Sequence, residues 1–173
     1  MISTSRVLTP SGYQTLADLR TAAVSFDLIR DDAGVTEDVP YPITGWGNTT
    51  LITLETGQII ELSDNALVML CTDITRNYMS YAVASAVEAD DYVVMRFKGD
   101  LGKVMPGSTG TPKTNDKWFT TYVKVVNVAD GGAKAVHGFG IPTNETNRHA
   151  IINGIVMKMK APSEFTTGTG SGL

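Results

Sequence analysis

The chain has 173 residues, a net charge of -4 and 42% hydrophobic residues, values that fit one globular domain with a substantial core. Because this charge balance provides no basic field for phosphate groups, we do not expect nucleic acid as a partner. No stretch is apolar and long enough to cross a bilayer, so a membrane is not expected as a partner either. The single cysteine, Cys71, excludes an internal disulfide framework and fits a reducing compartment.

Apolar runs that are separated by glycine, proline and polar turns predict an all-β chain. We predict strands over residues 6–9, 22–29, 49–54, 58–62, 66–71, 92–97, 118–128, 135–141, 150–152 and 155–157. Helical structure is expected only as short turns, within residues 13–20 and 81–87. Residues 30–42 are predicted to form a loop or an edge hairpin, and residues 72–80 are predicted to be irregular.

Three short glycine-containing sequences predict tight turns. Glu-Thr-Gly at 55–57 closes one hairpin, Asp-Gly-Gly at 130–132 predicts a second, and Asn-Gly at 153–154 suits a type I′ turn. Residues 98–117 contain glycine and proline but few apolar side chains, so we predict a long loop inserted in a domain spanning residues 1–160. The Thr/Gly-rich residues 161–173 predict a flexible C-terminal tail.

A Val-Leu-Thr strand precedes a Ser-Gly-Tyr turn at residues 6–13, and further ordered blocks follow along the chain. These blocks occupy residues 53–57, 60–63, 83–94, 125–128 and 150–156. In content and order they resemble the blocks of the Hint family, the module shared by inteins and hedgehog autoprocessing domains. The resemblance implies a horseshoe of antiparallel strands with pseudo-two-fold symmetry. A loose internal repeat also relates residues 13–24 to residues 81–93.

Splicing in this family needs a Cys or Ser nucleophile at the first position, a Thr-x-x-His block, a penultimate His and a terminal Asn. Counted back from the first strand, the nucleophile position is expected just before Met1. Residues 63–66 align with Thr-x-x-His but end in Ala66, which cannot transfer a proton. Lys158 and Met159 occupy the positions of the His and the Asn. We therefore expect degenerate splicing positions at Ala66, Lys158 and Met159, and no catalytic residue.

Other residues with chemical potential are scattered along the sequence. His137, His149 and Cys71 are too few and too far apart to predict a zinc site, so we interpret them as core or surface residues. Acidic residues at 31–32 and 88–91 match no calcium loop and are interpreted as solvated turns. We therefore expect neither a metal nor a cofactor.

Two serines and two tryptophans allow alternative interpretations. Ser3 or Ser5 could act as a displaced nucleophile, although a role in an N-terminal turn is the simpler interpretation. Trp46 and Trp118 suit either interface anchors or core packing.

Three functional hypotheses follow. The first is a non-catalytic structural protein on an inactive intein-like scaffold, which contacts other protein chains in a symmetric assembly through residues 98–117 or 161–173 and takes no small-molecule substrate. A small, acidic, Thr/Gly-rich chain is what we expect of a phage virion component, such as a capsid decoration or tail accessory protein, with the cytoplasm as the other location. The second hypothesis is residual self-processing by splicing or autoproteolysis. The third is an unrelated enzyme whose titratable groups converge in a cleft.

Overall fold

The structure, a computed structural model, describes the chain except for residues 22–24, 33, 41–42, 100–116, 142–147 and 160–173. Nearly all of the predicted loop at 98–117 and the whole predicted tail at 161–173 therefore lie outside the described residues. The strands are β1 (Arg6–Thr9), β2 (Gly12–Thr15), β3 (Ser25–Ile29), β4 (Val35–Pro40), β5 (Ile43–Leu54), β6 (Ile59–Ser63), β7 (Leu67–Asp73), β8 (Tyr78–Val83), β9 (Tyr92–Gly99), β10 (Lys117–Gly138), β11 (His149–Ile152) and β12 (Ile155–Lys158). The helices are α1 (Leu16–Thr21) and the 3₁₀ helix η1 (Ala84–Ala86). Neither of these short helices could span a bilayer, and the described residues contain no longer one.

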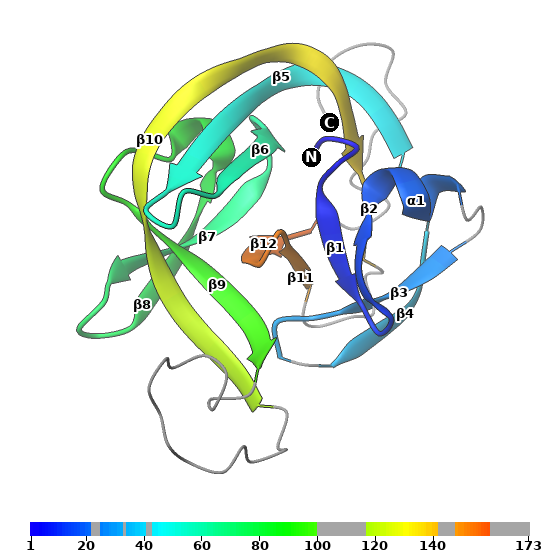
Figure 1. Cartoon of the computed structure of the whole chain (residues 1–173), viewed down its shortest axis with the longest axis horizontal. Coiled ribbons are helices and arrows are strands. Elements are labelled where there is room, and N and C mark those ends of the chain that lie inside the picture. The colour runs from blue at the N-terminus through cyan, green and yellow to red at the C-terminus, as the bar shows by residue number, and fades with distance from the viewer. Residues whose placement is uncertain (22–24, 33, 41–42, 100–116, 142–147, 160–173) are drawn as a thin grey trace.

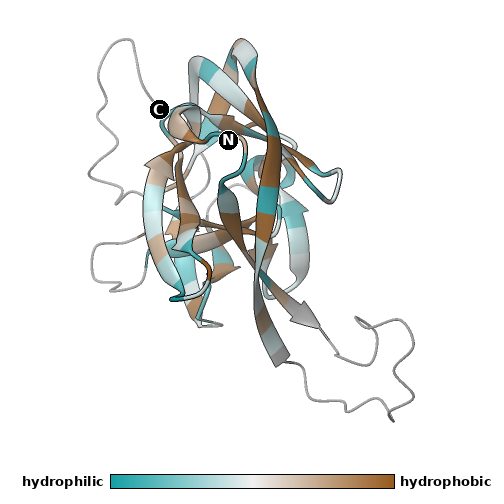
Figure 2. Cartoon of the chain, turned by 90° about the vertical axis from the view of Figure 1, so that its left-hand side faces the viewer, coloured by the Kyte–Doolittle hydropathy of each residue, from teal (hydrophilic) through white to brown (hydrophobic). Residues whose placement is uncertain are grey.

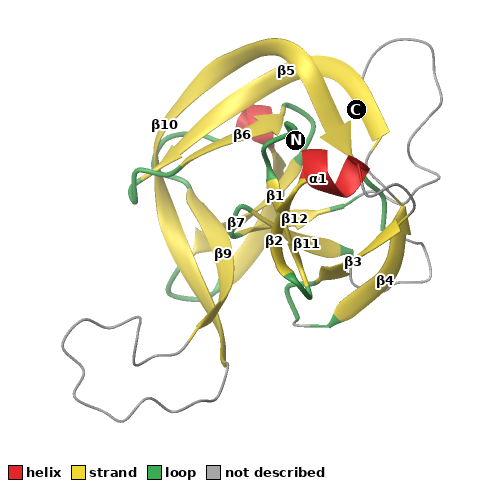
Figure 3. Ribbon diagram, turned by 45° about the vertical axis from the view of Figure 1, so that its right-hand side comes forward, coloured by secondary structure: helices red, strands yellow, loops and turns green. Residues whose placement is uncertain are grey.

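One antiparallel sheet of ten strands forms most of the molecule and curls on itself (Figure 1). Its strand order is β2-β1-β11-β12-β7-β9-β10-β5-β6, with β8 paired to β7 beside this path. Strands β3 and β4 form a separate two-stranded sheet. In Figure 3 the long strands β5 and β10 arch together over the body, while β11 and β12 lie in its middle. The all-β, antiparallel architecture that the sequence predicts is therefore confirmed.

The chain repeats one order of elements. The hairpin β1–β2, helix α1 and strands β3 to β5 are followed, after β6, by the hairpin β7–β8, helix η1 and strands β9 and β10. Strands β5 and β10, the long strands of the two halves, pair with each other over twelve residue pairs. The repeated order agrees with the pseudo-two-fold symmetry that the resemblance implies. Within the described residues, the loose sequence repeat covers the end of a strand and the helix after it in each half.

Bands of brown alternate with paler or teal bands along the strands in Figure 2, and many of the apolar strand residues are buried in the core. Residues buried completely include Leu28, Leu54, Leu62, Val125 and Ile152. The opposite face of the sheet carries a smaller buried cluster of Met69, Cys71, Val94 and Val156. Cys71 is therefore a buried small side chain, as the sequence predicts.

The predicted hairpin at residues 130–132 is wrong. Strand β10 continues through it, and the pairing with β5 shifts by one residue between Asp130 and Gly132. Gly132 adopts a φ of 75°, and the Asp130 carboxylate accepts a hydrogen bond from its N–H at 2.7 Å. Because β5 extends past both sides of this point, the extra residue makes a β-bulge that bends the strand instead of reversing it.

Several other predicted boundaries also differ. Residues 72–80, predicted to be irregular, contain the end of β7 and the start of β8, which pair with each other. Residues 13–15 and 81–83 belong to strands, so each predicted helical turn is shorter than expected. The hairpin at 55–57 is confirmed, and positive φ angles at Asn153 (51°) and Gly154 (87°) agree with the predicted type I′ turn. Of the alternatives for residues 30–42, the edge hairpin is correct.

Candidate functional site

A small cavity lies where the ends of β6, β10 and β12 meet, and we call it the pocket. It is lined by Met1, Ser63, Asn65, Ala66, Leu67, His137, Gly138, Phe139, Met157, Lys158 and Met159. Its volume is about 60 Å³. This is well below the roughly 300 Å³ at which cavities begin to enclose drug-sized ligands.

The pocket brings together the three positions at which the sequence predicts that splicing groups have been replaced. Lys158 pairs with Leu67 across β12 and β7, which places the preceding residue, Ala66, beside the end of β12. The Ala66 N–H donates to the Ser63 carbonyl at 2.9 Å, so the turn after β6 holds the Ala66 methyl group at the wall. Met159, which is buried, follows directly after Lys158. Segments far apart in the sequence thus converge at the pocket.

Met1 forms another wall of the pocket and is only 5% exposed. Its carbonyl accepts a hydrogen bond from the His137 N–H at 2.6 Å. Met1, which directly follows the position where the splicing nucleophile was expected, therefore lines the pocket. A thioether has no proton to lose and cannot serve as an oxygen or thiolate nucleophile.

The two serines near Met1 stay outside the pocket wall. The Ser5 hydroxyl accepts a hydrogen bond from the Ile2 N–H at 3.2 Å, and the Ser3 carbonyl accepts one from the Ala17 N–H at 3.0 Å. The first bond lies within the N-terminal turn, and the second joins this turn to the start of α1. The interpretation of Ser3 and Ser5 as turn residues therefore agrees with the structure.

His137 is a pocket residue that the sequence reasoning did not identify as one. The residue is 8% exposed, and its Nδ1 lies 3.0 Å from the Thr44 hydroxyl. Burial lowers the pKa of His137 below its ordinary value, and the positive charge of Arg20 lowers that pKa further. No local sequence signal places His137 here, because it reaches the pocket only if β10 passes through the bulge at 130–132 without turning back.

The groups at the pocket wall that can exchange a proton include the His137 imidazole and the Ser63 hydroxyl. A neutral imidazole can accept a proton, but the side chains of Met1, Ala66 and Met159 can neither donate nor accept one. The Lys158 ammonium lies beside the Tyr81 ring, with its Nζ 5.2 Å from the ring centroid.

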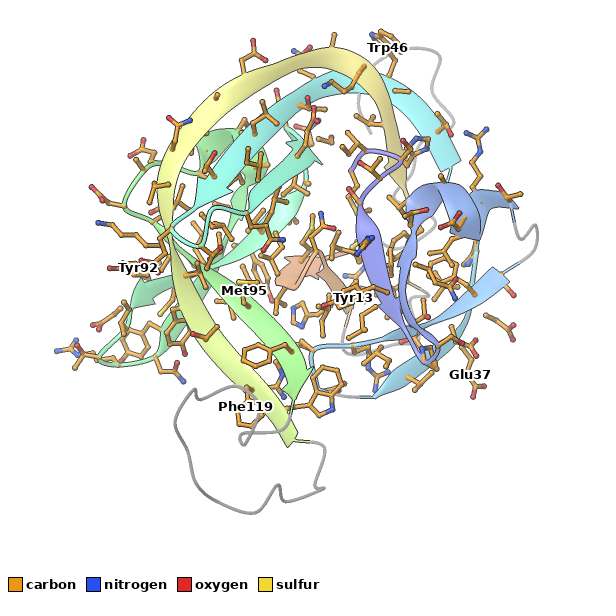
Figure 4. All side chains as sticks on the ribbon, in the orientation of Figure 1. Tyr13, Glu37, Trp46, Tyr92, Met95 and Phe119 are labelled. Carbon is orange, nitrogen blue, oxygen red and sulfur yellow. The ribbon has the colours of Figure 1, made fainter. Side chains whose placement is uncertain are left out.

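The remaining candidates lie elsewhere. His149 sits beside Tyr81 and Asp31, and not in the pocket. Trp46 is 69% exposed and points away from the arch of β5, so core packing is the wrong alternative for this residue (Figure 4). Trp118 is partly buried, with the Arg96 guanidinium 6.0 Å from its ring centroid.

Contacts of the acidic residues are known for the part of the chain that the structure describes. Across the residues that the structure describes, no three His, Cys, Asp or Glu side chains come together as metal ligands. The Asp90 carboxylate lies 2.6 Å from the Lys124 ammonium, and the Asp91 carboxylate accepts the Glu88 N–H at 2.8 Å. These contacts agree with the interpretation of residues 88–91 as an exposed turn.

No protein-family model and no curated protein matches the amino-acid sequence significantly. Solved structures do match. The DnaB intein from Synechocystis sp. superposes with a TM-score of 0.62 at 11% identity, over 91% of this chain and 96% of that chain. The DnaX mini intein from Spirulina platensis superposes with a TM-score of 0.61 at 12% identity, over 90% of this chain and 96% of that chain. The gp41-1 intein superposes with a TM-score of 0.60 at 13% identity, over 90% of this chain and 94% of that chain. With the arrangement of strands and the convergent pocket, these similarities show that the chain has the Hint fold of the inteins.

Proposed function

We propose that this chain uses the Hint fold as a non-catalytic scaffold for binding other protein chains and does not splice itself. The observation that carries the proposal is the apolar lining of the pocket at Met1, Ala66 and Met159. Cutting and rejoining a peptide bond requires a nucleophile and groups that move protons to and from it. Side chains ending in methyl and thioether groups supply neither.

The surface of the β7–β8 hairpin supports a role in assembly. Ile74, Tyr78 and Met79 are exposed large apolar residues within six positions, and we call them the hairpin patch. Strand β8 lies at a sheet edge, where it pairs with β7 alone. Edge strands with exposed aromatic and methionine side chains are favourable surfaces for protein contacts. The occupant that suits both the edge and the patch is another protein chain in a repeating assembly.

The absence of self-processing is tested by the intact mass of the purified protein. We expect the mass of 18.5 kDa to be unchanged after incubation with dithiothreitol, because the pocket provides no acyl intermediate for the thiol to cleave. Release of any fragment would contradict the proposal.

Assembly is tested by light scattering over a range of concentrations. We expect the chain to form particles of defined stoichiometry, and we expect the double substitution Tyr78→Ser with Met79→Ser to reduce their size. The matched control is Val35→Ser, which removes another exposed apolar side chain from a strand of the separate two-stranded sheet. A wild type that remains monomeric at every concentration, or equal effects of patch and control, would count against the assembly role.

We further propose that the assembly is a phage virion, in which the chain is a capsid decoration or tail accessory protein. The support is compositional: a small, acidic, Thr/Gly-rich chain with one cysteine. Mass spectrometry of purified virions from a phage that encodes the chain should detect it in stoichiometric amount. Recovery only in the soluble fraction of infected cells would favour the cytoplasm instead.

Residual self-processing is the second candidate, favoured by two groups that line the pocket together. Ser63 brings a hydroxyl and His137 a buried imidazole whose pKa is lowered by that burial and then by the charge of Arg20. If these groups act, thiol-dependent cleavage should be seen in the wild type and lost in His137→Gln. Unchanged mass in both proteins would remove this candidate.

A further inference from the structure

Three segments that are distant in the sequence meet on the face of the sheet that carries the smaller buried cluster. Tyr81 lies on β8, His149 begins β11, and Asp31 follows β3. The Tyr81 hydroxyl is hydrogen-bonded to Nε2 of His149. On the other side of the ring, Nδ1 of His149 lies 3.2 Å from the Asp31 carboxylate. Together with Lys158, these residues form what we call the tyrosine cluster.

The order of these contacts sets the direction in which a proton can move. A carboxylate beside Nδ1 favours the tautomer of neutral histidine that carries its proton on Nδ1. In that tautomer Nε2 carries no proton, so it is the atom that accepts in its hydrogen bond with the Tyr81 hydroxyl. At 3.2 Å the Asp31 carboxylate can act on the ring through its charge, and the imidazole can draw a proton from the hydroxyl.

Neighbouring groups hold the cluster in place and leave the tyrosine accessible. The Arg96 Nε donates to the Asp31 carbonyl at 2.5 Å, which ties the segment after β3 to strand β9. The rings of Tyr81 and His149 are inclined by only 28°, with their centroids 5.6 Å apart. The Lys158 ammonium lies 5.2 Å from the Tyr81 ring centroid, where it favours negative charge that develops on the phenol. Tyr81 itself is 40% exposed, so a reagent can reach it.

We propose that Tyr81 is an activated acceptor that takes an acyl group from an activated ester, with His149 as its general base and Asp31 as the positioning residue. The Tyr81 oxygen forms a bond to the acyl carbon while its proton passes to Nε2 of His149. The bond between that carbon and the leaving oxygen breaks, and the proton then passes from His149 to the departing group or to water. The product is an acylated tyrosine, with no change in oxidation state.

A general base is needed because the Tyr81 phenol is protonated near pH 7. Burial raises the pKa of Tyr81 above its ordinary value, and the negative charge of Asp31 raises that pKa further. Very little phenolate is therefore present near pH 7, and removal of the proton must accompany bond formation. His149 is placed to remove it. Because the proposal concerns one acylation at the sheet surface, it is independent of the role proposed for the pocket.

The test uses p-nitrophenyl acetate on the full chain, with peptide mapping by mass spectrometry at several times. The matched internal control is Tyr78, which lies three residues away on the same strand and is more exposed, at 59%. Exposure alone predicts faster acetylation of Tyr78. The proposal predicts that Tyr81 is acetylated about a hundredfold faster, the lower end of what a positioned general base contributes. Hydroxylamine treatment, which removes acetyl groups from tyrosine but not from lysine, distinguishes Tyr81 from Lys158.

Substitutions assign the roles. We expect His149→Gln to reduce the rate at Tyr81 to that at Tyr78, and Asp31→Asn to reduce it in part, with Asp31→Glu restoring much of the loss. The rate at Tyr78 should not change in any of these variants, whereas a general structural defect would change both. A rate at Tyr81 within tenfold of that at Tyr78 in the wild type, or one unaffected by His149→Gln, overturns the proposal even if another variant fails to fold.

Discussion

Methyl, thioether and phenyl groups line most of the pocket, whereas the tyrosine cluster, which shares Lys158 with it, is built from a phenol, an imidazole and a carboxylate. Buried residues such as Met1, Phe139 and Met159 form much of the pocket wall, and an unpaired charge beside them would be costly. The tyrosine cluster is half open, so water and neighbouring side chains can satisfy its ions. Acid–base groups therefore lie in both regions. His137 sits in the pocket among apolar side chains, and Tyr81, His149 and Asp31 lie on the accessible face.

The largest effect that we predict tests whether the pocket wall serves mainly for packing. Phe139 is fully buried there, with its ring centroid 5.2 Å from that of Phe26 in an edge-to-face contact. Phe139→Ala should lower the free energy of unfolding by about 3–5 kcal/mol, measured by urea denaturation. Tyr81→Phe removes one polar contact from the tyrosine cluster and should cost less than about 1.5 kcal/mol. Equal losses of unfolding free energy in Phe139→Ala and Tyr81→Phe would contradict the view that the pocket wall serves mainly for packing.

A second prediction disturbs the pocket from a distance through the bulge in β10. A Cβ atom at Gly131 would collide with the Thr49 hydroxyl and lie 3.1 Å from the Thr49 carbonyl oxygen. That hydroxyl donates to Glu61 at 2.7 Å, so the collision also breaks a buried contact. Gly131→Ala should therefore lower the free energy of unfolding by about 1–3 kcal/mol.

The control for the bulge is Ala133→Ser, an exposed change on the same strand, which should stay within about 0.5 kcal/mol of the wild type. Acetylation of Tyr81 should be unchanged in Gly131→Ala, because the tyrosine cluster uses neither β5 nor this part of β10. A loss of Tyr81 reactivity there would show that the two regions are coupled.

The bulge also marks the limit of what local sequence can predict. Most strands, the hairpin at 55–57 and the turn at 153–154 follow from alternation and turn chemistry within a few residues. An Asp-Gly-Gly sequence suits a hairpin turn and a bulge equally, since both need a residue with positive φ. The long partner strand β5 decides between them, and it lies about 80 residues earlier in the chain.

The pocket and the tyrosine cluster also differ in how far the sequence predicts them. The resemblance aligns Ala66, Lys158 and Met159 with positions in distant blocks, and the structure shows that they share one pocket. His137 was missed because its position depends on the bulge. Nothing in the sequence around Tyr81 points to residues 31 or 149, because only the curled sheet brings these segments together.

A third prediction uses pH to report on the pocket alone. The pKa of His137 lies below its ordinary value of 6.5 in the folded chain, first because of burial and then because of the charge of Arg20. As pH falls through 6.5, the unfolded chain takes up the proton first, so the folded state loses stability until the pH reaches the lowered pKa. His137→Gln should show a smaller loss between pH 7 and pH 5 in urea unfolding.

The effect is bounded, since one proton changes stability by at most about 1.4 kcal/mol per pH unit. Thr44→Ser keeps a hydroxyl beside Nδ1 of His137 and should retain the pH dependence of the wild type. If His137→Gln and the wild type lose stability in parallel, His137 is not held neutral by the pocket.

The smallest effect concerns Lys158, the residue that the two regions share. Lys158→Met keeps an unbranched side chain at the pocket wall and removes the ammonium beside the Tyr81 ring. An accessible cation–π contact contributes about 0.5–1 kcal/mol, so the free energy of unfolding should change by no more than this. If the ammonium also favours charge developing on the phenol, acetylation of Tyr81 should slow by ~2–5-fold, the same energy expressed as a rate. A loss of several kcal/mol in the free energy of unfolding with an unchanged acetylation rate at Tyr81 would show that Lys158 serves mainly in the pocket. A slower acetylation rate at nearly constant stability shows that the charge of Lys158 acts on the tyrosine cluster.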